Sequence, residues 1–523
     1  MTNRAILLYN FGTMKPKAMA ANPIIAANPI EESASRLSKL ERIKKSGANP
    51  YPQWTGRTHT IANVLENFDV LAAEQKEVVI AGRLRALRGQ GGTTFGNLED
   101  ASGRVQVFFR KDNLPADLYL RLEKEIDLGD FLAVYGKLMT TKTGEKTVLV
   151  TSWRLISKAL LPLPDKFHGL ADVEMRYRQR YLDLLANPES MRIAKIRSNV
   201  VKWIREFFDH RDFIEVETPI LQAIPGGASA RPFKTHHNAL DVDLYLRVAP
   251  ELYLKRLIVG GFEKVYEMAR CFRNEGIDHA HNPEFTQIEF YWAYADYEML
   301  MKLTEELLGG LVERIYGKRQ FEYEGAALNF KAPFPRLTFR DVIFKETKID
   351  LDKVRETKTL KKEIEKYLRT IIHVQQATFS FAGFNSFSEL ADQLYKYSCR
   401  PKIIQPTFIT DYPAEMIPLA KRKEDDQSKI ATMQLVVNGL EICKAYNELN
   451  DPIDQEERFH EQQALRERGA EEAMWFDEDY VIALKHGMPP TAGFGMGIDR
   501  LLQVLTGSHN LKEVILFPTL RPK

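Results

Sequence analysis

Cysteine is scarce in this sequence, and long apolar runs are missing. Only three cysteines occur among 523 residues, Cys271, Cys399 and Cys443, and neither a CxxC pair nor an HExxH segment is present. Structural zinc and a disulfide framework are therefore not expected, and the composition fits a reducing cytoplasm. No apolar stretch approaches the roughly 18 residues that a membrane helix needs, so we expect a cytoplasmic protein with no membrane partner.

An excess of charge of one sign is also lacking. The formal net charge is +2, with 28% charged and 44% hydrophobic residues, as in ordinary globular proteins. This balance excludes a grossly basic or acidic protein, but a local basic face can still bind nucleic acid. At 523 residues, the chain is too long for one core, and two or three domains are expected.

Turn residues and hydrophobic periodicity divide the chain into segments. After an opening stretch that lacks the form of a signal peptide, a helical segment leads to five short strands, with one helix between the third and fourth. This order suggests an OB-type barrel. Beyond a Pro-containing linker, helices mix with strands without regular βαβ alternation, which is an α+β pattern. The predicted segments are a disordered extension (1–32), a helical segment (33–74), the barrel (75–160), the linker (161–174) and the α+β domain (175–523), with an insertion at about 345–426.

The predicted barrel has aromatic side chains on its outer face. In TTFGNLED, Phe95 shares a face with polar residues, and in RVQVFFR, Phe108 shares a face with Arg104, Gln106 and Arg110. Aromatics interleaved with arginine suit single-stranded nucleic acid, because bases stack on rings while guanidinium groups hold phosphate. The alternative is that these rings pack against a neighbouring domain.

The stretch RNEGIDHAHNPEF, residues 273–285, lies between two segments with period two. This pattern predicts an antiparallel hairpin with one apolar face and one face that carries Arg273, carboxylates and aromatics. On the downstream strand the polar face holds Phe285, Gln287, Glu289 and Tyr291. Such a face is either a solvated surface with cross-strand ion pairs or the floor of a binding site, and its aromatic residues favour the floor.

Three further segments carry candidate site residues. In GFGMGIDR, glycines allow close backbone approach, and Arg500 lies in the first turn of a predicted helix, where a bound anion would be favourable. Glu251 lies in the first turn of another predicted helix, where it is either a binding residue or a surface residue that complements the helix dipole. Glu441 lies in the middle of an apolar strand, and Glu448 lies where that strand ends. Such carboxylates can hold divalent cations that bridge nucleotide phosphates.

These motifs together resemble those of the class II lysyl-tRNA synthetases of the bacterial type, which are class IIb aminoacyl-tRNA synthetases. The resemblance extends from about Ser33 to the C-terminus. FIEVETP (213–219) resembles motif 1, FRNE with HNPEF resembles motif 2, and GFGMGIDR resembles motif 3. PGGASARPF, APELYLK and YNELNDP narrow the likeness to the lysine enzymes. It implies an N-terminal OB-fold anticodon-binding barrel and a class II catalytic domain built on an antiparallel sheet flanked by helices.

The resemblance also implies residue roles, with Arg273 and Arg500 as the catalytic residues. The implied ATP-binding residues are Arg273, Glu275, His281, Asn282, Phe285, Glu441 and Arg500. The implied lysine-binding residues are Gly227, Glu251, Arg273, Glu289, Tyr291, Glu448 and Asn450. The implied Mg²⁺ ligands are Glu441 and Glu448, and the implied anticodon-reading residues are Arg88, Phe95, Gln106 and Glu145.

The implied activity is ATP-dependent ligation of L-lysine to tRNA(Lys) through a lysyl-adenylate, with release of pyrophosphate and AMP. An aspartate- or asparagine-specific relative is the first alternative, although Glu251 and Glu289, two of the implied lysine-binding residues, would repel acidic substrates. A non-catalytic RNA-binding paralogue is the second alternative. The segment NVVKWIREFFDHRDF (199–213) is apolar enough to predict a homodimer. The sequence departs from the family at Lys444, where asparagine is usual, and in the first thirty or so residues, which have no family counterpart.

Overall fold

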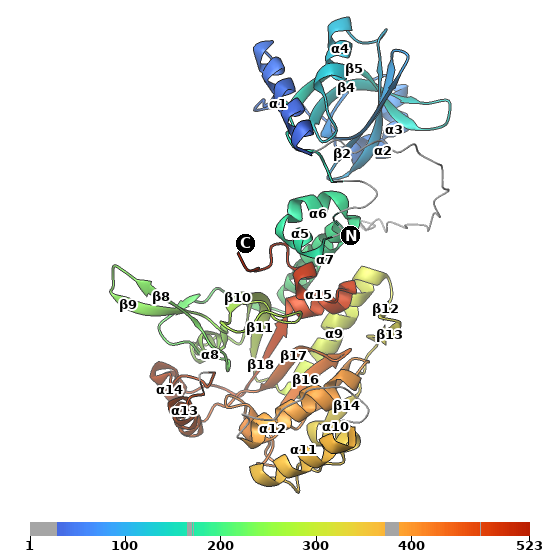
Figure 1. The fold of residues 1–523 in the computed structure, drawn as a ribbon. Helices are drawn as coiled ribbons and strands as arrows, with labels where there is room; N and C mark the ends of the chain where they lie inside the picture. The colour runs from blue at the N-terminus through green and yellow to red at the C-terminus, as the bar shows by residue number, and fades with distance from the viewer. Residues whose placement is uncertain (1–28, 165–169, 171, 372–385, 471, 523) are drawn as a thin grey trace. The chain divides into compact units, whose positions relative to one another are not determined.

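The structure, a computed structural model, describes residues 29–164, 170, 172–371, 386–470 and 472–522 (Figure 1). Its contacts divide the chain into two units, residues 1–165 and 166–523, which are considered one at a time. Most of the predicted disordered extension lies outside the described residues, and helix α1 (Pro29–Lys45) begins at Pro29. Within the described residues, no helix combines the length and the apolarity needed to cross a membrane.

The first unit contains a closed barrel with strand order β1-β2-β3-β5-β4. Its strands are β1 (Val78–Gln90), β2 (Thr93–Asp100), β3 (Gly103–Arg110), β4 (Phe131–Thr140) and β5 (Lys146–Ser157). Its other helices are α2 (Ile61–Glu66), α3 (Phe68–Ala73) and α4 (Ala116–Glu125). The five strands and the helix between the third and fourth confirm the predicted OB-type barrel. As the period of β3 predicts, Val105, Val107 and Phe109 are buried in the barrel core.

The second unit is built on an eight-stranded sheet with the order β14-β15-β16-β17-β18-β11-β10-β6. Its strands are β6 (Ile214–Glu215), β10 (Lys264–Phe272), β11 (Glu284–Ala293), β14 (Arg336–Thr338), β15 (Thr407–Thr410), β16 (Thr432–Val437), β17 (Leu440–Asn447) and β18 (Thr491–Gly497). The pairs that involve β6 and β14 are parallel, whereas the five central pairs are antiparallel. This sheet and its helices confirm the predicted α+β class.

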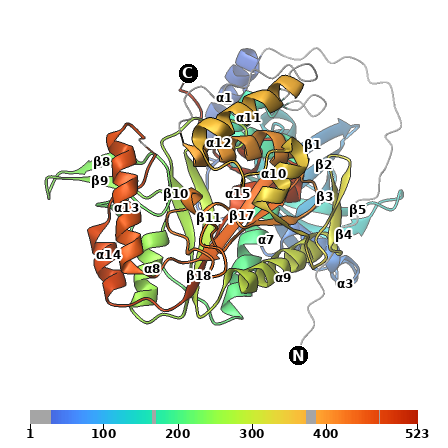
Figure 2. The same ribbon diagram turned by 90° about the horizontal axis from the view of Figure 1, so that it is seen from below.

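Helices and two small sheets surround the large sheet. The helices are α5 (Val173–Arg178), α6 (Arg180–Ala186), α7 (Pro188–Asp209), α8 (Glu251–Val259), α9 (Tyr297–Tyr316), α10 (Phe339–Thr347), α11 (Thr357–Ile371), α12 (Phe387–Leu394), α13 (Pro452–Glu467), α14 (Glu478–Lys485), α15 (Ile498–Thr506) and α16 (Leu511–Val514). The short turns are η1 (Tyr395–Cys399), η2 (Arg400–Lys402) and η3 (Ala414–Met416). The small sheets contain β7 (Leu221–Gln222), β8 (Phe233–His237) and β9 (Val242–Leu246), and β12 (Gln320–Tyr323) with β13 (Ala326–Asn329). Figure 2 shows α8, α13 and α14 side by side.

Alternation along the central strands separates the core of the second unit from its polar face. Ile288 and Phe290 of β11, with Phe494 and Met496 of β18, belong to the main apolar core, which α7, α9 and α15 also form. The residues between them point to the opposite face of the sheet, because successive side chains of a strand alternate. The large sheet therefore has one face covered by these helices and one face on which Gln287 and Glu289 of β11 lie.

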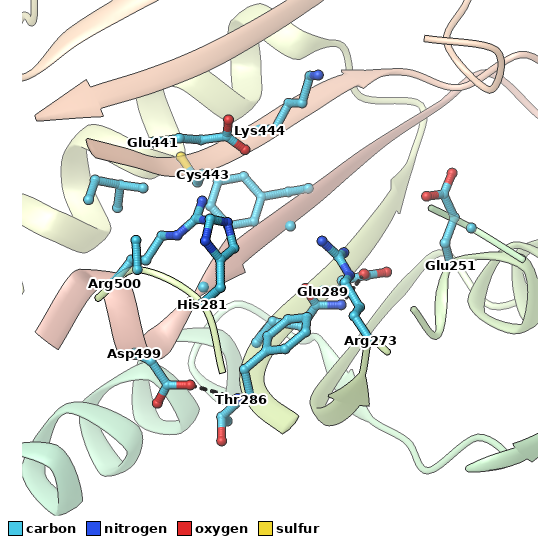
Figure 3. A pocket seen from close by; sticks show the side chains of 18 of the residues that line it. Glu251, Arg273, His281, Thr286, Glu289, Glu441, Cys443, Lys444, Asp499 and Arg500 are labelled. Carbon is cyan, nitrogen blue, oxygen red and sulfur yellow. Dashed lines mark hydrogen bonds between the residues drawn. The ribbon is translucent and has the colours of Figure 1, made fainter. Parts of the chain in front are cut away.

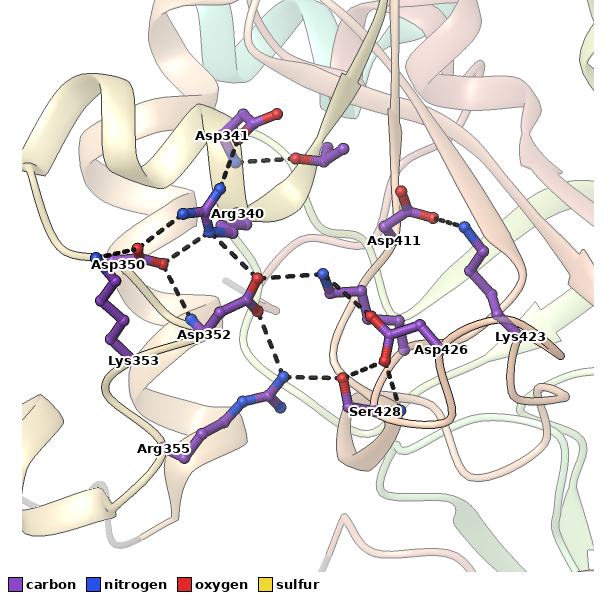
Figure 4. A network of polar contacts seen from close by, with 12 residues as sticks. Arg340, Asp341, Asp350, Asp352, Lys353, Arg355, Asp411, Lys423, Asp426 and Ser428 are labelled. Carbon is purple, nitrogen blue, oxygen red and sulfur yellow. Dashed lines mark hydrogen bonds and ion pairs between the residues drawn. The ribbon is translucent and has the colours of Figure 1, made fainter.

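The predicted insertion, at about 345–426, contains the last residues of α10, then α11, α12, η1, η2, β15 and η3, and its residues 372–385 lie outside the described residues. A polar network joins its first part to the loop before β16 (Figure 4). Arg340 donates two hydrogen bonds of 2.7 Å to Asp350 and lies 3.2 Å from Asp352. Lys429, from the loop, donates to Asp352 at 3.2 Å, so the network connects segments that are about eighty residues apart.

The apolar segment 199–213, from which a homodimer is predicted, is partly buried within one chain. Val200, Ile204 and Phe208 of α7 are buried in the main core of the second unit, as is Phe213. Exposed apolar side chains of this region include Met191 of α7 and, further along the chain, Ile214, Ile220 and Leu221. Packing within one chain therefore accounts for the buried face of α7, and the homodimer stays a prediction.

Candidate active site

A cavity of about 240 Å³ lies on the polar face of the large sheet (Figure 3). Its lining includes most of the residues that the resemblance implies: Gly227, Glu251, Arg273, Glu275, His281, Asn282, Phe285, Glu289, Tyr291, Glu441 and Arg500. These residues come from β11, β17, α8, the start of α15, the loop between β10 and β11, and the loop between β7 and β8. Figure 3 shows Glu251 on one side of Arg273, and Glu441, His281 and Arg500 on the other.

Strand β11, which forms a hairpin with β10, contributes part of the floor of this cavity. Its register pairs Cys271 with Phe285 and Glu267 with Glu289, as the period-two pattern predicts. Glu289 and Tyr291 are only 6% and 3% exposed. Carboxylates on a solvated sheet surface would be accessible, so the polar face of this hairpin is a buried floor.

A β-bulge in β17 sets which of its side chains reach the cavity. Leu435 of β16 pairs with Cys443, but the next residue, Val436, pairs with Glu441, so Ile442 is the extra residue. A bulge reverses the alternation of faces beyond it. Glu441 and Lys444 therefore lie on the same face although they are three residues apart, and both line the cavity.

The acidic end of the cavity contains two buried carboxylates, Glu251 and Glu289. Glu289 accepts hydrogen bonds from Gln287 Nε2 at 2.6 Å and Tyr291 Oη at 3.3 Å, and among the described residues it makes no ion pair. Burial, and next the charge of Glu251, raise the pKa of Glu289 well above its usual value. Glu251 accepts from Tyr446 Oη at 2.7 Å. A bound cation would relieve this excess of negative charge.

Lys255 is the buried cation beneath this end of the cavity. Its Nζ lies 2.6 Å from Glu251 Oε1 and also forms an ion pair with Glu448. Although burial alone would lower it, the two glutamates raise the pKa of Lys255 above its usual value. The single ammonium group of Lys255 thus forms ion pairs with both Glu251 and Glu448. Glu289 instead accepts hydrogen bonds from the neutral side chains of Gln287 and Tyr291.

The other end of the cavity presents guanidinium groups. Arg273 Nε is buried and has no hydrogen-bond partner among the described residues, and the guanidinium lies 5.0 Å from the Phe285 ring centroid. Arg500 lies in the first turn of α15, and its Nη2 is 3.3 Å from His281 Nε2. An arginine in the first turn of a helix, and another with an unsatisfied donor, favour a bound anion.

Two glycines allow close packing around the acidic end. Gly227 has φ +87°, and a Cβ there would lie 2.8 Å from the Cβ of Glu251. At Gly493 of β18, a Cβ would lie 2.0 Å from Glu448 Oε1 and would also collide with the ring of Tyr291. Any larger residue at either position would displace the buried carboxylates.

Glu448 and Asn450 do not line the cavity. Glu448 is 1% exposed and faces Lys255, beneath Gly493. Asn450 accepts from Lys421 Nζ at 3.0 Å and donates to the Met488 carbonyl at 3.0 Å. Both side chains are therefore engaged below or beside the cavity, at the end of β17.

Glu441 is the carboxylate at the anion-binding end. Burial works against ionisation there, but Lys444 and Arg500 outweigh it and hold the pKa of Glu441 below its usual value. No cluster of three or more His, Cys, Asp or Glu side chains in the described part of the chain could hold a metal ion. A single carboxylate that faces a cavity suits Mg²⁺ that binds mainly to nucleotide phosphates, so the residues present fit a metal ion that enters with the nucleotide.

The four residues that are predicted to read the anticodon belong to the barrel, and their contacts are as follows. Arg88 pairs with Phe95 in the register of β1 and β2, and Phe95 stacks on Phe108 with centroids 4.1 Å apart and planes 7° apart. Gln106 accepts from Thr147 Oγ1 at 2.7 Å. Glu145 lies in the turn before β5 and is exposed. Each of the two rings is partly exposed.

Three residues of the site were missed by the sequence analysis, namely Lys255, Gln434 and Tyr446. Lys255 could have been found, because it lies four residues after Glu251 in an apolar helix, on the same face. Tyr446 shares a face with Glu448 by simple alternation. Gln434 had no signal in the sequence, because its contact with Glu441 depends on strand pairing.

Comparisons with known proteins agree with this geometry. Residues 172–521 match the family of tRNA synthetases class II (D, K and N), and residues 78–156 match the OB-fold nucleic acid binding domain. The chain is 46% identical to the lysine–tRNA ligase of Carboxydothermus hydrogenoformans over 488 residues, which cover 93% of this chain and 97% of that protein. It is also 46% identical to the lysine–tRNA ligase of Escherichia coli K12 over 514 residues, which cover 97% and 99% of the two chains.

Proposed function

We infer that this chain, which belongs to the class II tRNA synthetases (D, K and N), is a lysine–tRNA ligase. It uses ATP to ligate L-lysine to its cognate tRNA through a lysyl-adenylate, with release of pyrophosphate and AMP. The observation that carries this conclusion is the pair of buried carboxylates, Glu251 and Glu289, of which Glu289 lacks an ion-pair partner in the described part of the chain. The site therefore suits an extended substrate with a terminal cation.

The acidic end selects the side chain of the substrate. We assign the ε-ammonium group to Glu289 and Glu251, with Tyr291 as a further contact. A neutral side chain would leave these carboxylates buried and unpaired, and an acidic one would be repelled. Gly227, Glu448 and Asn450 are proposed for the α-amino end. For the latter two, this requires a rearrangement, because Glu448 faces Lys255 and Asn450 bonds to Lys421.

The anion-binding end orients the nucleotide. Arg273 is proposed to hold the α-phosphate and the carboxylate of lysine, since its Nε is buried without a partner among the described residues. Phe285 and Arg500 are proposed to enclose the adenine, with Glu275 at its amino group. His281 and Asn282 are proposed to lie near the phosphates and ribose.

The reaction needs no protein nucleophile. The carboxylate oxygen of lysine attacks the α-phosphorus, the bond to the pyrophosphate oxygen breaks, and pyrophosphate carries away the electron pair. Arg273 and Arg500 thus act by positioning and by neutralising charge that develops on phosphate oxygens. In the second step, a hydroxyl of the terminal tRNA ribose attacks the lysyl carbonyl, and AMP leaves.

Enzymes of this family use ATP together with metal ions, and we propose that the ion here is Mg²⁺. When bound, it neutralises the triphosphate and favours the departure of pyrophosphate. Glu441 lines the cavity and is the proposed ligand. Glu448, the second proposed ligand, could take this part only if its carboxylate left Lys255.

The barrel is proposed to read the anticodon through Arg88, Phe95, Gln106 and Glu145. Phe95→Ala should weaken tRNA aminoacylation by about 1–3 kcal/mol, the range for a lost base stack, while ATP–pyrophosphate exchange without tRNA stays intact. Equal loss of both activities would instead assign Phe95 to folding, because it stacks on Phe108.

Assembly and location are further proposals. The exposed apolar side chains of Ile214, Ile220 and Leu221 support a homodimer with two-fold symmetry. Light scattering at micromolar concentration should give twice the mass of one chain. A cytoplasmic location is proposed, since the substrates are found there and the three cysteines are free and buried.

The decisive test is ATP–pyrophosphate exchange, measured separately with each of the twenty amino acids. Exchange with lysine alone is expected. Exchange with aspartate or asparagine would refute the assignment of the acidic end to the lysine side chain. If none of the twenty amino acids supports exchange, the proposal that the chain is a lysine–tRNA ligase is refuted.

A further inference from the structure

Gln434 of β16 connects the insertion to Glu441. It lies opposite Lys444 in the register of β16 and β17, is 4% exposed, and does not itself line the cavity. Its amide is engaged at both ends. The Nε2 group donates to Glu441 Oε2, while Oε1 accepts from Tyr395 Oη at 2.8 Å and from Tyr412 Oη at 2.7 Å.

The two tyrosines determine which end of the amide faces Glu441. An amide presents an acceptor at one end and donors at the other. With the amide reversed, its carbonyl oxygen would face the carboxylate of Glu441, and both hydroxyl groups would lose the acceptor that they share. Burial is the main factor that raises the pKa of Tyr395 and of Tyr412 above the usual value, so both hydroxyls stay protonated and able to donate.

The positions of these tyrosines are themselves fixed by packing. Tyr395 and Tyr412 are 1% and 2% exposed, and the ring of Phe339 lies against both, at centroid distances of 5.0 and 4.4 Å. Tyr395 begins the π-helical turn η1, whereas Phe339 begins α10. Packing on Phe339, which lies just before the insertion, therefore holds the two hydroxyl groups that orient Gln434.

We propose that Gln434 is a positioning residue for Glu441, and that Tyr395 and Tyr412 fix the direction of its amide. With Oε2 engaged by Gln434, Glu441 presents Oε1 to the cavity, and so offers one oxygen rather than two to the metal ion that accompanies ATP. The proposal rests on the proposed function, because it assigns Glu441 to that ion. It adds a role for the insertion, whose Tyr395 and Tyr412 contact Glu441 through Gln434.

The test uses the double variant Tyr395→Phe/Tyr412→Phe, which removes both hydroxyl donors and keeps the rings that pack on Phe339. The Mg²⁺ concentration for half-maximal exchange should rise about fivefold, as for the loss of hydrogen bonds worth about 1 kcal/mol. Mn²⁺ binding, measured by electron paramagnetic resonance with a non-hydrolysable ATP analogue and lysine, should weaken equally. The KM for lysine should stay within about twofold, whereas general loosening of the fold would raise it as well.

Three further variants make the result decisive. Tyr397→Phe, an exposed tyrosine of the same turn, should change neither metal measurement. Gln434→Met removes the amide and should match the double variant; it also decides the matter if the double variant does not fold. Glu441→Gln should shift both metal measurements. If Glu441→Gln shifts them but the double variant and Gln434→Met do not, the positioning role is refuted while the proposed function stands. If Glu441→Gln does not shift them, the metal assignment fails, and the inference fails with it.

Discussion

Carboxylates meet cations in two regions of the second unit, and the balance of charge differs between them. In the network of Figure 4, Asp350 receives two hydrogen bonds from Arg340, and Asp352 lies near both Arg340 and Lys429. The Arg340 side chain is the main factor that lowers the pKa of Asp350 to about 2. In the cavity, burial raises the pKa of Glu289. The carboxylates of the network are paired with cations of the chain itself, whereas Glu289 in the cavity makes no ion pair within the described residues.

The largest effect, a loss of stability, is expected from removing Lys255, the buried cation beneath the cavity. Lys255→Met leaves Glu251 and Glu448 without an ammonium group, and breaking a buried ion pair from one side costs about 3–5 kcal/mol of the free energy of unfolding. Urea unfolding of the full chain, followed by a probe in residues 166–523, measures this loss. The matched change Lys429→Met, in the partly exposed network, should cost less than about 1 kcal/mol. Equal losses would mean that the two regions do not differ in this way.

The next effect concerns the carboxylate that lacks a cation. Glu289→Gln should raise the KM for lysine about a hundredfold, which corresponds to about 2.7 kcal/mol and lies in the range for a buried charged partner. The KM for ATP should change less than about threefold. The matched change Asp352→Asn should leave both constants unaltered. An unchanged KM for lysine in the Glu289 variant would place the ammonium group elsewhere.

Much of this second unit follows from local patterns in the sequence. Period two predicts the β10–β11 hairpin, its apolar face and its polar floor, because alternation depends only on the strand itself. The same rule misplaces side chains in β17, where the bulge at Ile442 puts Glu441 and Lys444 on one face. That bulge is a property of the pairing with β16, which the sequence of β17 alone does not contain.

The parts of the site that the sequence does not reveal depend on contacts between distant segments. Gln434 is adjacent to Glu441 only because their strands pair, and Tyr395 joins them from the insertion. The apolar segment 199–213 is a second case. Val200, Ile204 and Phe208 pack into the core of the same chain, and an apolar pattern identifies a buried face without showing what buries it.

A smaller effect on the requirement for Mg²⁺ is expected from a change at Lys444. It lines the cavity and sits 5.4 Å from the centroid of the Tyr412 ring, and its charge favours the ionised form of Glu441. Lys444→Gln removes a positive charge that competes with a divalent ion, so the Mg²⁺ concentration for half-maximal exchange should fall about threefold, as expected for a partly screened charge. A rise instead would show that Lys444 binds the triphosphate directly. The exposed change Lys366→Gln is the control.

The smallest effect concerns the acid stability of the network. The pKa of Asp350 is lowered to about 2, below the value of about 3.9 for an unfolded aspartate. Its contribution to stability is therefore fully present above about pH 4 and is lost as the pH falls toward 2. Asp350→Asn should lower the Tm by a constant amount from pH 5 to 7, and the difference from the unsubstituted protein should narrow below pH 4. Calorimetry across this range measures it, with the exposed change Asp425→Asn as the control. A difference that is independent of pH would mean that Asp350 acts by its hydrogen bonds alone, and the contrast with Glu289 would then not be one of charge.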